Sequence, residues 1–118
     1  MKAIKCLDIY EYLDIDKLLG DVDLVFSAEG SLDYQTPRGK IPAEIGMRAK
    51  KRGLPVIVLA GSIGKGAEVN YEYGIDSFTS ILDGPCTLEE AITNAASLLE
   101  SSSEQTMRMV LVGMKLKK

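Results

Sequence analysis

The sequence predicts an α/β fold: a Rossmann-like parallel sheet of about three strands, in the order β-α-β-α-β, flanked by helices and followed by two C-terminal helices. Three short apolar segments, at residues 22–27, 55–61 and 77–82, have the composition of buried strands. Helical patterns fill both connections between them. Each connection is long enough to bring the chain back in the same direction, so we expect neighbouring strands to be parallel.

The second strand, residues 55–61, is the clearest of the three. Its nearly continuous run of valine, isoleucine and leucine is typical of a strand covered on both faces. The first strand, residues 22–27, is followed by the glycine-containing stretch Ala28-Glu29-Gly30. The third ends at a turn signal, Asp83-Gly84-Pro85.

The connecting segments have helix signals at both ends. The first helix is expected to begin near Pro42, because proline suits the first helical position, and to end at Gly53 after a cationic last turn. A shorter helix over residues 67–73 is expected to end at Gly74.

Both ends of the chain also have helical patterns. Thr87 and Glu90 match a capping box ahead of one C-terminal helix, and a second helix is expected to start near residues 102–105. Residues 4–19 predict two short helical pieces joined at Asp14. We treat residues 1–118 as a single α/β domain. Three strands are few for such a sheet, so the pattern predicts a partial domain: a larger sheet has been cut, or a partner completes it.

Composition restricts the function classes. The chain has 118 residues and a net charge of −3, so nucleic acid is not an expected partner. The start of the chain lacks the apolar stretch of a signal peptide and no run is long enough to span a membrane, which predicts a soluble, cytoplasmic protein. The chain has no histidine, which excludes histidine-dependent triads and metal sites. Cys6 and Cys86 are expected to be reduced.

The most informative segment is polar and follows the first strand. It contains two acidic side chains, an amide, hydroxyl groups and cations in sixteen residues, including Glu29, Asp33, Gln35, Thr36 and Lys40. Open α/β sheets place their ligand crevices at the carboxyl ends of strands, where this segment is expected to lie. The alternative is an ordinary polar surface loop.

A second candidate segment, residues 61–66, follows the second strand and is rich in glycine. Gly61, Ser62 and Lys65 could present backbone N–H groups, a hydroxyl and a cation to an anion. The spacing matches neither a Walker motif nor a dinucleotide fingerprint, and an ordinary strand-to-helix turn remains an equal alternative.

The two segments are expected to share one edge of the sheet because both follow parallel strands. That edge would hold Glu29, Asp33, Lys40, Ser62 and Lys65. Phosphoryl transfer needs this mixture: cations and backbone donors for phosphate charge, a carboxylate for Mg²⁺, and another to position an attacking hydroxyl.

These residues carry a family resemblance. The order Glu29-Gly30, Asp33, Gln35-Thr36, Gly39-Lys40 and Pro42 resembles the Glu-Gly-x-x-Asp-x-Gln-Thr-x-x-Gly-Lys-x-Pro signature of the type I glycerate kinases. The resemblance covers nearly the whole chain but only the C-terminal third of those longer enzymes. It implies phosphorylation of D-glycerate by ATP with Mg²⁺ in the complete enzyme, and an inactive isolated chain. The alternative is a non-catalytic, self-associating α/β module derived from that family.

The resemblance also implies roles for the site residues. Asp33 is the first candidate for orienting the acceptor hydroxyl or holding Mg²⁺, against an Asp that stabilises its own turn. Glu29 would serve the metal or the substrate, and Lys40 the phosphate; their alternatives are a backbone partner and a solvated lysine. Substrate or nucleotide contacts are implied for Gly30, Gln35, Thr36, Gly39, Gly61, Ser62 and Lys65.

Two positions depart from the family pattern. Ala28 stands where the family usually has glycine, and Ser31 where it usually has arginine. Loss of the arginine removes a planar bidentate donor for phosphate or carboxylate. The departures weaken the assignment to glycerate more than the assignment to the fold.

Overall fold

The computed structural model describes residues 14–38 and 41–116. Its centre is a parallel sheet in the order β1-β2-β3, formed by β1 (Val25–Leu32), β2 (Val56–Ile63) and β3 (Ser77–Ser80). Val25 of β1 is opposite Val56 of β2, and Ile57 of β2 is opposite Ser77 of β3. The α/β class and the parallel order of the strands are confirmed.

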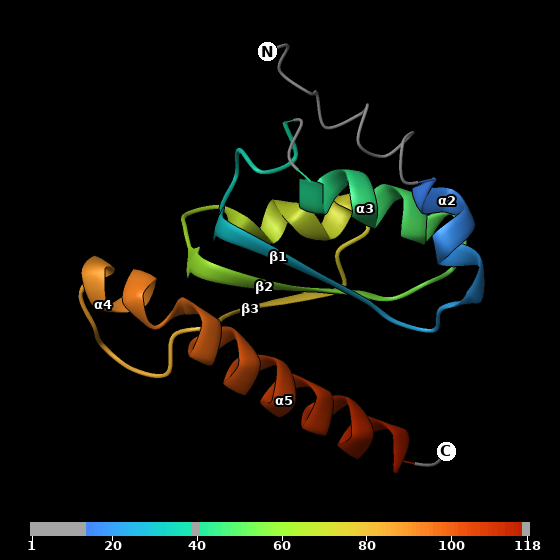
Figure 1. The fold of residues 1–118 in the computed structure, drawn as a ribbon. Coiled ribbons are helices and arrows are strands. Elements are labelled where there is room, and N and C mark those ends of the chain that lie inside the picture. Colours follow the sequence, from blue (N-terminus) through green and yellow to red (C-terminus); the bar gives the residue numbers. More distant parts are fainter. Residues whose placement is uncertain (1–13, 39–40, 117–118) are drawn as a thin grey trace.

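One face of the sheet is covered by the two connecting helices. The helix α3 (Ile41–Lys50) and the 3-10 helix η2 (Ala67–Tyr73) lie on the same side of the sheet (Figure 1). The two approach backbone to backbone: a Cβ added to Gly46 would lie 2.4 Å from the carbonyl oxygen of Tyr73. Gly74 ends η2 at φ 85°, a left-handed conformation that favours glycine.

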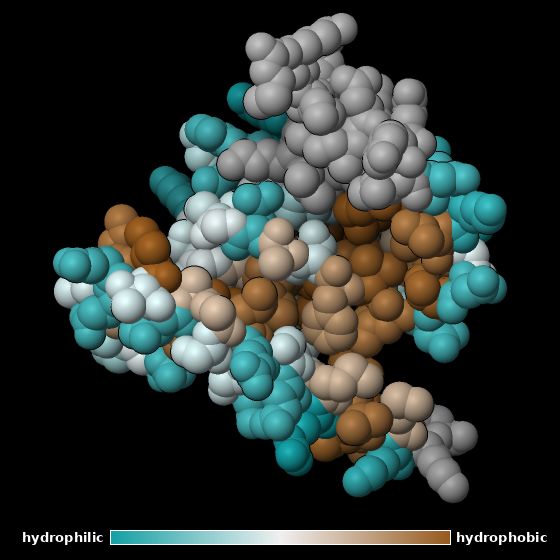
Figure 2. Space-filling view, in the orientation of Figure 1, coloured by the Kyte–Doolittle hydropathy of each residue, from teal (hydrophilic) through white to brown (hydrophobic). Residues whose placement is uncertain are grey.

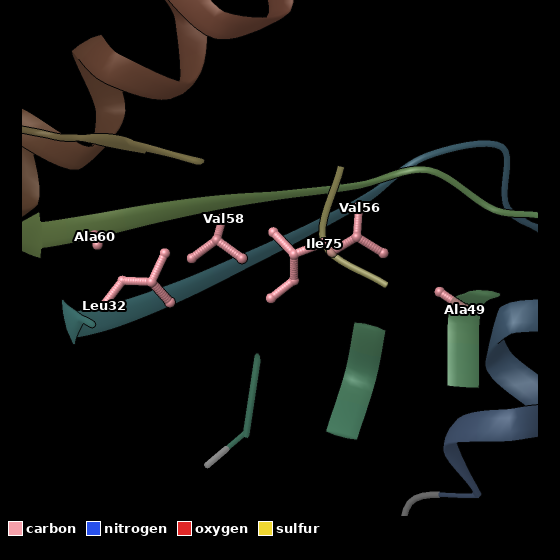
Figure 3. Close-up of a cluster of buried hydrophobic side chains, with 6 residues drawn as sticks. All are labelled: Leu32, Ala49, Val56, Val58, Ala60 and Ile75. Carbon is pink, nitrogen blue, oxygen red and sulfur yellow. The ribbon is translucent and has the colours of Figure 1, made fainter. Parts of the chain in front are cut away.

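The hydrophobic core lies between the sheet and this helical layer. Its buried members come from β1, α3, β2 and the short segment between η2 and β3, and Figure 3 draws them: Leu32, Ala49, Val56, Val58, Ala60 and Ile75. The central strand β2 contributes three of the six, as expected for the only strand with two neighbours among those described.

Within the described part of the chain, the opposite face of the sheet is covered only by the C-terminal helices α4 (Leu88–Thr93) and α5 (Ala95–Met114). In Figure 1, α5 crosses below the sheet and diverges from it toward the C-terminal end. No residue of either helix is buried. This face of the sheet is therefore only partly covered, whereas the α3 face has a closed core.

The first two strands start and end later in the sequence than predicted. The prediction of residues 22–27 is wrong at both ends, because the ladder starts where the Val25 N–H donates to the Pro55 carbonyl and continues to Leu32. The polar segment after residue 27 stays extended because β2 also continues, to Ile63, and the two backbones satisfy each other. The hydropathy of residues 28–31 does not predict this part of the strand, because backbone pairing and not side-chain burial extends it.

The prediction that a second C-terminal helix starts near residues 102–105 is also wrong. The break between the C-terminal helices lies at Asn94, and α5 is continuous through the serines. Ser103 and Thr106 donate their hydroxyls to the carbonyls of Glu100 and Ser102, so these side chains bond within the helix. The predicted capping box is confirmed: the side chains of Thr87 and Glu90 each accept from the other residue's N–H.

The start of the described chain agrees with a short helical piece after Asp14. Asp14 has φ 49°, and α2 (Ile15–Leu18) and the 3-10 turn η1 (Leu19–Asp21) follow it. The piece predicted before Asp14, and Cys6, lie outside the described residues. Cys86 is an exposed free thiol. None of the helices in the described part of the chain is long and apolar enough to cross a membrane.

Candidate active site

Two polar segments lie side by side at the carboxyl ends of β1 and β2. The Gly64 N–H donates to the Leu32 carbonyl at 2.7 Å, and the Tyr34 N–H donates to the Lys65 carbonyl at 3.2 Å. These bonds link the turn after β1 directly to the turn after β2. The expected common edge is therefore present.

Glu29 and Ser62 reach this edge from strands rather than from loops. Glu29 is opposite Ala60 in the ladder and is half-buried, and its Oε1 accepts the N–H of Gly30 at 3.1 Å. The Ser62 hydroxyl lies 3.2 Å from that of Ser31 across the two strands. Because strand positions are held by the ladder, both side chains are anchored more firmly than loop residues would be.

Asp33 organises the turn that follows β1. Its Oδ1 accepts the Gln35 N–H at 2.8 Å, and its own N–H donates to the Thr36 hydroxyl at 2.9 Å. This is an Asx turn, the structural alternative to a catalytic role. The second carboxylate oxygen, Oδ2, has no hydrogen bond within the described residues, so the turn occupies only one of the two oxygens.

Thr36 and Gln35 differ in what they can reach. Thr36 is fully buried, with its hydroxyl accepting the Asp33 N–H, so it fixes the turn and is closed to a ligand. Gln35 is exposed, and its amide Nε2 donates to the Tyr34 hydroxyl at 2.8 Å. Of the pair, only Gln35 has a side chain open to solvent.

Asn70 belongs to this arrangement and was not predicted. Its Nδ2 donates to the carbonyls of Asp33, at 3.0 Å, and Ala67, at 2.8 Å, and the residue is fully buried. Its Oδ1 is buried and has no hydrogen-bond partner among the residues that the structure describes. Nothing in the local sequence marks this asparagine, because its burial arises only when η2 packs against the turn after β1.

Lys65 places a cationic side chain at this edge of the sheet. It is exposed, and its backbone carbonyl anchors Tyr34. Gly39 and Lys40, the other predicted site residues of this segment, lie outside the described residues.

A groove of about 760 Å³ adjoins the site between the sheet and the C-terminal helices. Its sheet side is formed by Ala28, Glu29, Gly30, Leu59, Gly61 and Ser62. The rest of the lining is apolar and comes from the segment after β3 and from α4 and α5. Figure 2 shows hydrophobic residues gathered between the sheet and α5. The groove therefore has a polar end at the strand termini and an apolar body.

The carboxylates match part of what a magnesium–nucleotide complex needs. Among the residues that the structure describes, no three His, Cys, Asp or Glu side chains are grouped as a metal site. Mg²⁺ bound with a nucleotide takes only one or two protein carboxylates, the other ligands being phosphate oxygens and water. Glu29 and Asp33 supply donors of the right type, so the edge fits Mg²⁺ delivered with phosphates better than a metal held by protein alone.

Comparison with known proteins decides the family. The glycerate kinase family model matches residues 5–111. The chain belongs to the glycerate kinase family. It is 37% identical over 110 residues to a glycerate kinase of Bacillus subtilis (strain 168), and this aligned segment covers 93% of this chain and 28% of the relative.

Other glycerate kinases show the same partial coverage. A glycerate kinase of Halalkalibacterium halodurans is 38% identical over 95 residues, covering 80% of this chain and 25% of the relative. Glycerate 2-kinase of Escherichia coli (strain K12) is 33% identical over 103 residues, covering 87% and 27%. The chain thus spans about a quarter of the length of the curated glycerate kinases it matches.

Proposed function

We propose that this chain carries one wall of the site of an ATP-dependent glycerate kinase, which in the complete enzyme transfers the γ-phosphoryl group of ATP to a hydroxyl of D-glycerate. The observation that carries the proposal is the shared edge at the ends of β1 and β2. Hydrogen bonds between the two turns bring Asp33 and Lys65 to one edge, with Glu29 and Ser62 on the adjoining strands. Family membership supplies the substrate class.

The geometry refines the proposed roles. Asp33 keeps one oxygen in its turn and presents the other to the acceptor hydroxyl, whose proton this oxygen accepts as the phosphoryl group arrives and ADP leaves. Lys40, and Lys65 from the second turn, offset the phosphate charge. Gln35 contacts substrate, while Thr36 and Asn70 hold the turn from inside.

The remaining residues form the phosphate side. Gly30, Gly39 and Gly61 allow close approach of backbone to ligand, and Ser62 offers a hydroxyl. Mg²⁺ would be held by Glu29 or Asp33 together with the nucleotide phosphates, and it supplies charge stabilisation to the transferring group.

The test uses the Bacillus subtilis relative with its aligned segment replaced by this chain, a protein we call the chimera. We expect glycerate-dependent ATP turnover by the chimera and none by the isolated chain. The double substitution Asp33→Ala with Lys40→Ala is expected to lower turnover roughly 100-fold or more. Asp23→Ala is the matched control, since Asp23 is exposed and precedes the opposite end of β1. Full turnover in the double variant would remove the site assignment.

A second candidate function is a non-catalytic module that associates with copies of itself. The absence of buried residues in the helices α4 and α5 favours it, because soluble proteins rarely leave large apolar patches uncovered. Light scattering tests it directly. A strictly monomeric chain at high micromolar concentration would exclude it.

A further inference from the structure

The groove beside the candidate site is open along its apolar body. Its apolar lining includes Leu59 from β2, Ile81 and Leu82 after β3, and Leu88, Ile92 and Leu99 from the helices. Leu88 and Ile92 remain 76% and 67% exposed. The helix side of the groove therefore leaves apolar surface in water, and a further surface against it would bury that surface.

The C-terminal half of α5 is apolar around most of its circumference. Since a helix turns once in about 3.6 residues, neighbouring positions point in different directions. Met109 is 71% exposed and Met114 is 73% exposed, and the residues between them include Leu111 and Val112, at 47% and 58%. A helix that is apolar on nearly all sides is normally enclosed on nearly all sides. One flat contact would leave part of this segment in water.

A separate apolar surface lies at the outer edge of β1. Leu18, Val22 and Phe26 are exposed there, at 60%, 37% and 40%, around a hollow of about 490 Å³. None of the residues that line this hollow belongs to α4 or α5. The two apolar surfaces meet at Ala28 of β1, which lines both, and they otherwise lie on different elements of the described chain.

We propose that the groove and the C-terminal half of α5 are the seat of the part of a glycerate kinase polypeptide that this chain does not span. The relatives extend over about four times the aligned length, so a large further stretch of polypeptide is available to fill it. A second copy is the weaker occupant, because a two-fold contact joins one self-complementary patch and leaves the other in water.

Seating this polypeptide also completes the candidate site. Glu29, Gly30 and Ser62 line the groove, so whatever fills it lies against these residues of the proposed phosphate site. The inference rests on the proposed function for this last step, whereas the docking itself is measured without activity.

The experiment compares the same substitutions in two proteins, the isolated chain and the chimera. Ile92→Glu and Met109→Glu place a carboxylate in the proposed seat. Met47→Glu is the control, because Met47 is 39% exposed on α3, across the sheet. In the isolated chain all three side chains are at the surface, and we expect small changes in the urea midpoint.

In the chimera, Ile92→Glu and Met109→Glu are each expected to lower the urea midpoint by roughly 1 M or more, because a carboxylate is then buried in an apolar contact. Met47→Glu should leave it unchanged. Equal, small effects of all three variants, or a chimera that does not fold cooperatively, would overturn the proposal. Dimerisation of the isolated chain that Ile92→Glu abolishes would assign the seat to a second copy instead. A folded chimera with the expected shifts but no turnover would refute only the proposed function.

Discussion

The contact between α3 and η2 makes Gly46→Ala a sensitive probe of the core. In an exposed helix interior, replacing glycine by alanine stabilises a protein by about 0.5–1 kcal/mol, since alanine loses less backbone entropy. At Gly46 the added Cβ would lie 2.4 Å from the Tyr73 carbonyl oxygen and 3.2 Å from the Gly74 carbonyl carbon. Both are backbone atoms, so no side-chain rotation can relieve the overlap.

The helix must therefore move away from η2. Such overpacking costs about 1–3 kcal/mol, and the backbone contact places Gly46 in the upper part of that range. After the gain in helix propensity is subtracted, we expect a net loss of about 1–2 kcal/mol. With a urea dependence of about 2 kcal/mol/M, in the middle of the usual range, the midpoint should fall by roughly 0.5–1 M.

Gly113→Ala is the matched control for this measurement. Gly113 lies in α5 with nothing within 4 Å of an added Cβ, so the same substitution should be neutral or stabilising by up to about 1 kcal/mol. Urea unfolding followed by circular dichroism gives both values. If Gly46→Ala proved as stable as the unsubstituted chain, the close approach of α3 and η2 would be wrong.

Two further predictions concern hydrogen bonds at element ends. Asp76→Ala should destabilise the chain by about 1–3 kcal/mol in urea unfolding, because the buried Val56 N–H donates to Asp76 Oδ2 at 2.7 Å and would lose its acceptor. Asp76→Asn keeps an acceptor oxygen and should destabilise the chain less. Equal losses of stability in the two variants would contradict this reason. Hydrogen bonds from Thr87 lower the pKa of Glu90, the backbone N–H having the larger effect and the side chain the smaller. The stability that the ionised Glu90 side chain gives the helix cap is therefore complete above the usual glutamate pKa and is lost as pH falls through the lowered pKa. Thr87→Ala should raise the pKa of Glu90, measured by an NMR titration, and weaken α4 by about 1 kcal/mol; an unchanged pKa would exclude the side-chain contribution.

The shared edge that carries the candidate site could be predicted in part because its components are local. The order of acids, amide, glycines and lysine between residues 29 and 40 is visible in the sequence, and parallel strands bring their carboxyl ends to one edge whatever lies between them. The short spacings in the sequence predict a first strand that ends at residue 27, which places Glu29 in the loop after it. Its position on β1 depends on the pairing with β2, which no periodicity in residues 28–32 reveals.

Burial of the polar groups could not be predicted. Thr36 and Asn70 have polar side chains in segments that look exposed, yet both are fully buried where the turn after β1 meets η2. Whether a hydroxyl or an amide is buried depends on which backbone packs against it. That contact joins residues more than thirty positions apart.

The sequence by itself determined the α/β class, the parallel strand order, the capping box of α4 and the family signature, since each is written in residue types at short spacing. Only the tertiary structure decided the rest: that Glu29 stands on a strand, that Thr36 faces inward, and that α5 carries an open apolar surface. Apolar residues on a helix indicate that something covers them. Which surface covers them is a property of the assembled layers, and in this chain the α3 face is closed while the α5 face is not.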